Sequence, residues 1–216
     1  MTDWRYERKY RITEVMSQSV VAGLLCHPAG FRRQYSDRQI NNIYFDTPEL
    51  KTFQENLAGI SERSKYRLRW YGPRLDRVDN ARWEVKSRRN MLGTKSVTPV
   101  NGVYTLEDLM AIKRMVNGTF APEVDLHPKL INTYQRSYFI SADRRFRATV
   151  DRSLDFLPLS GQPRHTRFNL TDPAVILEVK YAFSDDDRAV HVLDAIPYRQ
   201  SKSSKYVTGI LMSVQT

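Results

Sequence analysis

Residues 64–71 alternate between large apolar and cationic side chains over the whole stretch. Successive side chains of a β-strand leave opposite faces of the sheet, so one face of this strand would be apolar and the other cationic. The apolar set is Tyr66, Leu68 and Trp70, and the cationic set is Lys65, Arg67 and Arg69. Guanidinium forks suit phosphate oxygens, so the pattern predicts a phosphate-binding strand face. The alternative for Arg67 and Arg69 is an exposed edge strand protected by charge.

Three more stretches carry a glutamate and a lysine two residues apart, backed by large apolar residues. The pairs are Glu7 with Lys9, Glu84 with Lys86, and Glu178 with Lys180. In an open sheet they would form cross-strand ion pairs in water, each worth only about 0.2 to 1 kcal/mol. In a closed sheet the same faces would line a charged channel, because a barrel of about eight strands holds side chains or one small ligand inside. Because the glutamate–lysine pair recurs on separate strands, we expect these charged faces to share one function.

Hydrophobic periodicity and turn residues divide the chain into further strands and helices. The expected strands are 4–12, 39–46, 64–71, 83–87, 129–141, 146–154, 163–170 and 175–183, with 88–98 as a loop or short strand. The expected helices are 13–25, 47–57, 105–117, 184–197 and 201–214. Thr47 and Pro48 predict one helix start, and Thr105 with Asp108 predicts another that ends at Gly118. At 216 residues the length favours a single domain, 1–216.

The formal net charge of +10 predicts an anionic partner, such as nucleic acid, a phosphorylated metabolite or anionic lipid. One cysteine, Cys26, excludes an internal disulfide and fits a reducing compartment, and we expect it in the core. The start of the chain has no signal-peptide pattern, and the longest apolar run, 20–26, is too short to span a bilayer. We therefore expect a cytoplasmic protein, and peripheral association with a membrane is compatible with this.

Several enzyme classes lack their motifs here. The sequence contains no P-loop, no G-x-G-x-x-G, no H-E-x-x-H and no G-x-S-x-G, and its four histidines are scattered. What remains on predicted strand faces is a set of cations interleaved with three carboxylates. The cations are Lys9, Arg67, Arg69, Lys86, Arg136, Arg147 and Lys180, and the carboxylates are Glu7, Glu84 and Glu178. Phosphoryl transfer proceeds by positioning and charge neutralisation, so this set suits it, with carboxylates as ligands for Mg²⁺ or Mn²⁺.

An ordered series of short motifs runs through nearly the whole chain: YERKY, IYFDT, SERSKYRLRWYG, WEVKS, YQRSYF, LEVKY and a C-terminal SKY. This series resembles the catalytic domain of the vacuolar transporter chaperone (VTC) family, the polyphosphate polymerases, which belong to the triphosphate tunnel metalloenzymes. The resemblance implies an α+β fold, an antiparallel eight-stranded β-barrel forming a tunnel, with flanking helices. It also implies ATP and inorganic polyphosphate as substrates and Mn²⁺ or Mg²⁺ as cofactor.

The resemblance further implies roles for individual residues. Phosphates would be cradled by Arg67, Arg69, Lys86, Arg136 and Arg147. The triphosphate or product chain would be guided by Lys9, Lys95 and Lys205. From the strand pattern we add Lys180, Glu7 and Glu84 to the substrate-binding set. Glu178 would hold the metal. Lys95 and Lys205 lie outside the clean strand patterns, and without the resemblance they would be interpreted as surface lysines.

The chain departs from the hydrolytic branch of this superfamily at its first strand. That branch reads E-x-E-x-K, whereas here Arg5 takes the first glutamate position and only Glu7 and Lys9 remain. The loss of one carboxylate argues for the polymerase-like branch. Two alternatives stay open: a triphosphatase or polyphosphatase of the same fold, and a non-catalytic polyanion- or RNA-binding module. Nucleic acid is the less favoured partner, and coupling to transport would require a separate membrane protein.

Overall fold

The structure, a computed structural model, describes residues 5–13, 16–89, 92–120, 124–159 and 170–215. The strands of its main sheet are β1 (Arg5–Ile12), β2 (Arg32–Asp46), β3 (Glu62–Tyr71), β5 (Arg82–Arg89), β6 (Leu92–Pro99), β8 (His127–Ile140), β9 (Arg147–Pro158), β10 (Leu170–Asp172) and β11 (Val175–Ala182). A separate short ladder joins β4 (Arg77–Val78) and β7 (Tyr104–Thr105). The helices are α1 (Ser17–Leu25), α2 (Lys51–Ala58), α3 (Leu109–Phe120), α4 (Asp186–Asp194) and α5 (Lys205–Val214), and a 3₁₀ turn spans Phe183–Asp185.

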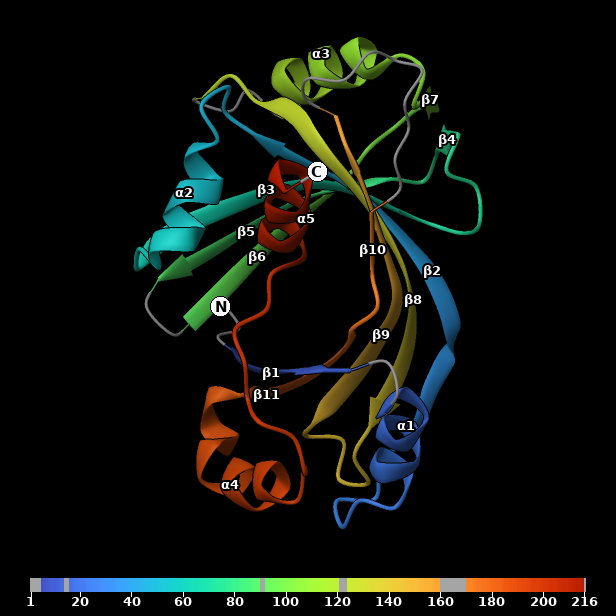
Figure 1. Cartoon of the computed structure of the whole chain (residues 1–216), viewed down its shortest axis with the longest axis vertical. Coiled ribbons are helices and arrows are strands. Elements are labelled where there is room, and N and C mark those ends of the chain that lie inside the picture. The colour runs from blue at the N-terminus through green and yellow to red at the C-terminus, as the bar shows by residue number, and fades with distance from the viewer. Residues whose placement is uncertain (1–4, 14–15, 90–91, 121–123, 160–169, 216) are drawn as a thin grey trace.

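The main sheet is antiparallel and closes on itself. Its strand order is β10-β9-β11-β1-β6-β5-β3-β2-β8, and β8 pairs again with β9. This second pairing joins every strand of the sheet except β10 into an eight-membered ring (Figure 1). The expected α+β class and eight-stranded antiparallel barrel are therefore confirmed. In the described part of the chain, no helix has the length and apolar character needed to cross a bilayer.

The ring is weakest between β1 and β6, where the register contains a single pair, Arg5 opposite Gly93. Past this point the edge of β1 is occupied by the segment that leads into α5. Tyr10 forms a bridge with Gln200, and the backbone N–H of Ser201 donates to the carbonyl of Lys9. The chain near its C-terminus thus pairs with β1 beyond the point where β1 leaves β6.

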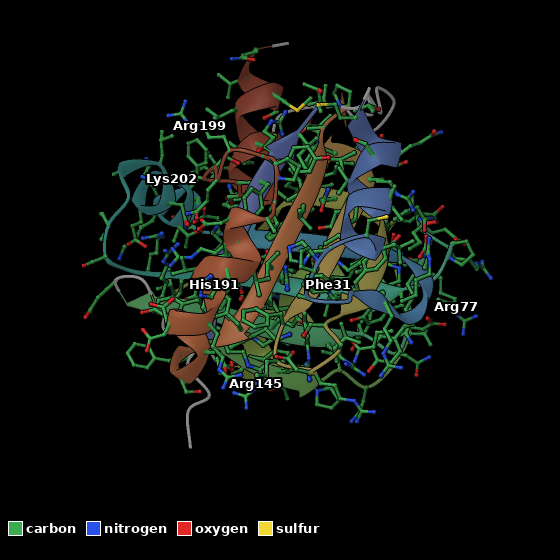
Figure 2. All side chains as sticks on the ribbon, turned by 90° about the horizontal axis from the view of Figure 1, so that it is seen from below. Phe31, Arg77, Arg145, His191, Arg199 and Lys202 are labelled. Atoms are coloured by element: carbon green, nitrogen blue, oxygen red, sulfur yellow. The ribbon has the colours of Figure 1, made fainter. Side chains whose placement is uncertain are left out.

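Apolar side chains from the outward strand faces pack under the helices. The outer faces of β1, β9 and β11 meet α1 and α4 in one core cluster, which includes Leu177, Val179 and Val20. Figure 2 shows α1 and α4 lying across this side of the sheet. The outer faces of β3 and β5 meet α3 in a second cluster around Trp70 and Trp83. The alternation in the sequence therefore fixes which strand faces are covered by helices and which face inward.

The helix α5 packs against the concave side of the sheet instead. Its buried Tyr206 and Ile210 join Leu130, Phe156 and other side chains of β2, β8 and β9. The approach is close: a Cβ on Gly209 would lie 2.5 Å from Leu130 Cδ2 and 2.6 Å from Phe156 Cδ1. Only glycine allows this packing, which fills one end of the barrel interior and places the start of α5 near the charged residues.

Helix boundaries differ from the sequence expectation for identifiable reasons. The first helical residue of α2 is Lys51 and not Pro48, because Leu50 before it has a left-handed backbone with a φ of 60°. The Thr47 hydroxyl accepts from the N–H of Lys51 as expected of a cap, and the Asp46 carboxylate accepts from the N–H groups of Thr52 and Phe53. Asp108, not Thr105, caps α3 by accepting from the N–H of Ala111.

Two further helix boundaries and the burial of Cys26 also differ from expectation, and one expected strand is not tested. Gly118 lies inside α3, and α5 begins only at Lys205, since the residues before it bind β1. Cys26 is exposed, not buried in the core. The expected strand 163–170 lies outside the described residues except for Leu170 in β10.

Candidate functional site

The inward faces of the ring strands, together with the first residue of α5, carry a connected set of charged side chains. The cations are Lys9, Lys65, Arg67, Arg69, Lys86, Lys95, Arg136, Lys180 and Lys205, and the carboxylates are Glu7, Glu84, Asp151 and Glu178. Cations outnumber carboxylates, so each carboxylate serves more than one cation. The interior therefore keeps a positive excess in a partly desolvated space, which favours an anionic ligand.

Three lysines lie side by side across adjacent strands. Lys65 of β3 is opposite Lys86 of β5, and Lys86 is opposite Lys95 of β6. Like charges directly opposite in a sheet repel each other. Burial lowers the pKa of all three ammonium groups, that of Lys86 to about 8, and Lys9 and Lys86 push the pKa of Lys65 down further. A bound polyanion would relieve this repulsion, so we call this row the lysine ladder.

Glu84 is the common counter-ion beside the lysine ladder. Its side chain is 2% exposed, and its oxygens lie 2.5 Å from Arg67 Nη2, 2.9 Å from Lys95 Nζ and 3.7 Å from Arg69 Nη1. Burial acts to raise the pKa of Glu84, but the three cations outweigh it and bring the pKa to about 2. Glu84 thus remains ionised and holds the arginines of β3 in place while leaving part of their charge unbalanced.

A second group surrounds Lys180 of β11. Its Nζ lies 2.8 Å from Glu178 Oε1 and 3.6 Å from Glu7 Oε1. Glu7 Oε2 also accepts from Lys86 at 2.6 Å, and Glu178 Oε2 lies 3.2 Å from Lys9 Nζ. Burial and the nearby Glu178 act to raise the pKa of Glu7, but the lysines bring it to about 2. The predicted residues Glu7, Lys9, Lys86, Glu178 and Lys180 are therefore brought into one cluster.

The third group joins the sheet to α5. Arg136 Nε donates to Asp151 Oδ1 at 2.6 Å, and Lys205 Nζ donates to Asp151 Oδ2 at 2.5 Å. Burial acts to raise the pKa of Asp151, but Arg136 and Lys205 lower it to about 2. Tyr134 sits between the groups: Lys205 Nζ lies 4.5 Å from its ring centroid, and Arg69 Nη2 donates to its hydroxyl at 3.3 Å. Lys205, from the last helix, is thereby placed among the strand cations.

A divalent metal would find hard oxygen ligands at Glu178 and Glu7. Both carboxylates have lowered pKa values and flank the same ammonium group of Lys180. No cluster of three or more His, Cys, Asp or Glu side chains suited to a metal occurs among the described residues. Mg²⁺ is commonly bound by one or two protein carboxylates, with substrate phosphates supplying further ligands. Glu178 and Glu7 therefore fit such a metal. When bound with substrate, it would supply charge neutralisation at the phosphoryl group.

Arg147 stands apart from the other predicted residues. It begins β9 opposite Lys180 of β11, so it shares the inward face, but it is exposed at the end of the strand. It forms no ion pair with a carboxylate in the described ranges. We place it at the rim of the tunnel.

The sequence analysis did not single out Asp151 and Tyr134 as site residues, and it placed Lys65 on the cationic face without giving it a role of its own. The alternation places Lys65 beside Arg67, but only the register reveals the lysine ladder. The alternation along β9 places Asp151 on the same strand face as Arg147, so the sequence did indicate its direction. Its partner Lys205 comes from a distant helix, which the sequence pattern does not indicate. Tyr134 is distinguished only by the cations that surround it in space.

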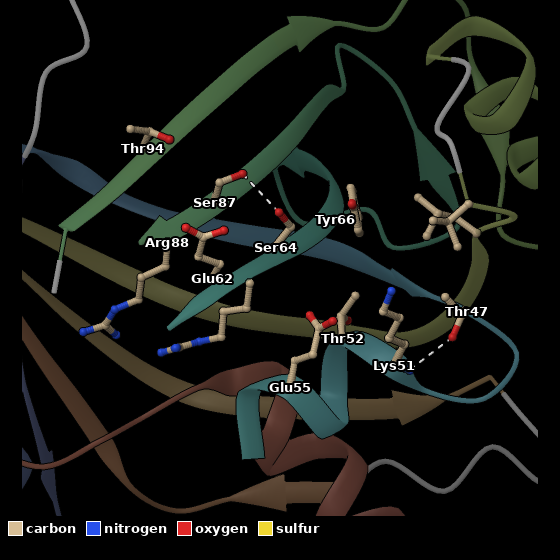
Figure 3. A pocket seen from close by; sticks show the side chains of 13 residues that line it. Thr47, Lys51, Thr52, Glu55, Glu62, Ser64, Tyr66, Ser87, Arg88 and Thr94 are labelled. Atoms are coloured by element: carbon tan, nitrogen blue, oxygen red, sulfur yellow. Dashed lines mark hydrogen bonds between the residues drawn. The ribbon is translucent and has the colours of Figure 1, made fainter. Parts of the chain in front are cut away.

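A polar cavity of about 750 Å³ lies at the ends of β3 and β5, beside α2 (Figure 3). Its wall includes Ser64, Ser87 and Thr94, which occupy the strand face opposite to that of the lysine ladder. Ser64 and Ser87 hydroxyls lie 3.1 Å apart. Most of this cavity is thus outside the ring, separate from the charged interior.

Comparisons with known proteins agree with this architecture. A solved structure of a "putative adenylate cyclase" from Vibrio parahaemolyticus has a TM-score of 0.57 at 15% identity, covering 96% of this chain and 99% of that one. A Hippeastrum "putative adenylyl cyclase", described as having a dominant triphosphatase activity, has a TM-score of 0.51 at 13% identity, with 97% and 95% covered. A "putative adenylate cyclase" from Bacillus halodurans has a TM-score of 0.51 at 11% identity, with 94% and 95% covered.

These likenesses show that the chain has the triphosphate tunnel fold. They show no more than the fold, because the sequence identities are low. The comparison with curated proteins gives no match. The model of the VTC domain family matches residues 4–214, nearly the whole chain. With the closed eight-stranded ring and its charged interior, that match shows that the chain belongs to the VTC domain family of triphosphate tunnel proteins.

Proposed function

We propose that this chain is a polyphosphate polymerase acting as one domain over residues 1–216. The terminal phosphate oxygen of a polyphosphate chain attacks the γ-phosphorus of ATP, the bond to the β-phosphate oxygen breaks, and ADP leaves. The observation that carries the proposal is the lysine ladder, in which Lys65, Lys86 and Lys95 line up across three strands. A row of like charges is costly without a ligand and suits a linear polyanion whose negative charges also repeat.

The predicted residues would divide the work by position. Arg67, Arg69, Lys86 and Arg136, with Arg147 at the rim, would neutralise the phosphates during transfer. Lys9, Lys95, Lys180 and Lys205 would guide the triphosphate or the growing chain. Glu178, assisted by Glu7, would hold Mn²⁺ or Mg²⁺, while Glu84 and Asp151 keep the cations oriented.

Hydrolysis is the second candidate function. Two ionised carboxylates, Glu7 and Glu178, flank Lys180, so a metal could be held in a tunnel where water replaces the phosphate acceptor. A dominant triphosphatase activity is also described for the Hippeastrum protein of similar fold. The absence of a carboxylate at Arg5 favours transfer to phosphate over this alternative.

The deciding experiment is incubation of the purified protein with ATP and Mn²⁺, followed by gel electrophoresis and ³¹P NMR of the products. Long chains with internal phosphate resonances would establish the polymerase. Orthophosphate alone would establish the hydrolase, and unchanged ATP would refute both for the isolated chain. In that last case a salt-sensitive, metal-independent polyanion complex would identify a binding module.

Two variants control this assay. Arg67→Ala removes a cation whose side chain is 19% exposed inside the ring, and it should abolish product formation. Arg74→Ala removes an arginine that is 64% exposed and paired with Asp76 outside the ring, and it should leave the activity unchanged. Circular dichroism spectra of both variants would show whether the fold is retained.

We further propose a cytoplasmic location, with any coupling to transport supplied by a separate membrane protein. Co-purification of the tagged chain with the membrane fraction, tested before and after a high-salt wash, would show whether it associates peripherally.

A further inference from the structure

The strand β2 continues beyond the end of its neighbour β3. The last pair between them is Ile40 opposite Tyr71, whereas pairing with β8 continues from Ile40 back to Arg32. Arg38 is therefore just past the end of β3, at a mouth of the tunnel. Its register partner on β8 is Arg136, and directly opposite residues of an antiparallel pair share one face. Arg38 thus continues the inward row of cations by one position.

Arg38 differs from the interior cations in its counter-ion. Arg136 is held by Asp151, and Arg67 by Glu84, but Arg38 contacts no carboxylate within the portion of the chain that the structure describes. The adjacent Asp37 is already bound by two other arginines, Arg33 and Arg152, each at 2.9 Å. The charge of Arg38 is therefore available to an external anion.

Two tyrosines orient the Arg38 side chain. Its guanidinium carbon lies 5.4 Å from the ring centroid of Tyr35 and 5.8 Å from that of Tyr138. The two rings are themselves in edge contact, with centroids 5.7 Å apart. A guanidinium held against aromatic faces keeps its forked N–H groups pointing outward for a phosphate, at a smaller entropic cost than a mobile side chain.

A protective role for an exposed strand edge would also account for an arginine on β2. That role needs charge on the edge but not a particular face. Arg33 places a charge on the edge of the same strand equally well. Its guanidinium carbon lies 5.5 Å from the ring centroid of Phe139, on the outward side of β8. The inward direction of Arg38, its alignment with Arg136 and its lack of a carboxylate are features that edge protection does not require.

We infer that Arg38, seated on Tyr35 and Tyr138, is a phosphate-binding position at the tunnel mouth that contacts a polyphosphate chain longer than the triphosphate bound inside. The inference rests on the proposed substrate, a linear polyphosphate. Arg38 is then a specificity-determining residue for chain length, because a triphosphate held by the interior cations would not extend past β3. Arg38 contributes to the binding of long chains and not to the transfer step.

Binding titrations test this without requiring turnover. The wild type and Arg38→Gln are titrated with tripolyphosphate and with a longer polyphosphate of defined length, at fixed salt. We expect wild type to bind the longer chain more tightly per molecule, and Arg38→Gln to lose about tenfold of that affinity, the size of one charge-assisted hydrogen bond. Its affinity for tripolyphosphate should be unchanged. Arg38→Lys should fall between the two, because it retains the charge but not the fork.

Arg74→Gln is the control, since it removes an exposed arginine that pairs with Asp76 outside the ring and leaves the partners of Asp37 in place. It should leave both affinities unchanged. Equal affinity of Arg38→Gln and wild type for the longer chain would overturn the inference, as would an equal loss for tripolyphosphate. If wild type binds neither ligand, the proposed function fails as well. If the products of ATP are only orthophosphate but Arg38→Gln still weakens long-chain binding, the polymerase proposal fails and the inference stands.

Discussion

Glu84 offers the most quantitative test of how the tunnel interior is held together. Its pKa falls from 4.5 to about 2 because Arg67, Arg69 and Lys95 outweigh its burial. This lowering of the pKa corresponds to about 3 kcal/mol in favour of the ionised form. Glutamine resembles the protonated carboxyl in size and charge. Glu84→Gln should therefore lower the free energy of unfolding at pH 7 by about 3 kcal/mol.

The sign with pH follows from the direction of the shift. Because the folded-state pKa is lowered, the stabilisation is fully present above about pH 4.5 and is lost as the pH falls toward about 2. The difference between wild type and Glu84→Gln should thus shrink in acid. Urea titrations at pH 7 and below pH 4.5 measure this difference in the free energy of unfolding. Thermal unfolding at pH 7 should give Glu84→Gln a melting temperature about 6 to 12 °C below that of wild type.

The control is Asp76→Asn, which removes a carboxylate from an arginine pair that is exposed on both sides and should change stability little. A loss below about 1 kcal/mol for Glu84→Gln would refute the reasoning, because it would mean that ion pairing only balances the desolvation of this carboxylate. The variant should also bind tripolyphosphate more tightly, since its three cations lose their counter-ion.

Three further predictions concern affinity and packing. Affinity for tripolyphosphate should fall about tenfold from pH 7 to pH 9, because Lys86 loses its proton near pH 8 and a bound anion favours the charged form; calorimetry that shows a rise would contradict this. Gly209→Ala should lower the free energy of unfolding by about 1 to 3 kcal/mol through overpacking, whereas Gly118→Ala, with open space at its Cβ, should raise it by about 0.5 to 1 kcal/mol; urea titration would separate the two. Tyr206→Phe removes the 2.6 Å hydrogen bond to Asp46 and should cost about 1 to 3 kcal/mol in the same assay, and an unchanged midpoint would show that this buried bond adds nothing.

The strand pattern was predictable because side-chain direction in a strand alternates with a period of two. Lys65, Arg67 and Arg69 therefore share a face in the sequence and in the fold. The helix starts were less predictable, because a cap depends on which side chain reaches the N–H groups. Asp46 reaches those of α2 from the end of β2, which a search for Thr47 and Pro48 does not reveal.

Residue identity and local geometry were enough to establish which side chains are cationic, that Lys65, Arg67 and Arg69 share one strand face, and that the opposite face is apolar; the strand that carries Lys95 was not clear from the sequence. The balance of those charges depends on the three-dimensional arrangement instead. The register of β3, β5 and β6 places Lys86 between Lys65 and Lys95, and α5 brings Lys205 to Asp151 from 54 residues away. Ion pairing depends on distance in space, and strand register with helix docking sets that distance, so no local pattern could assign these partners.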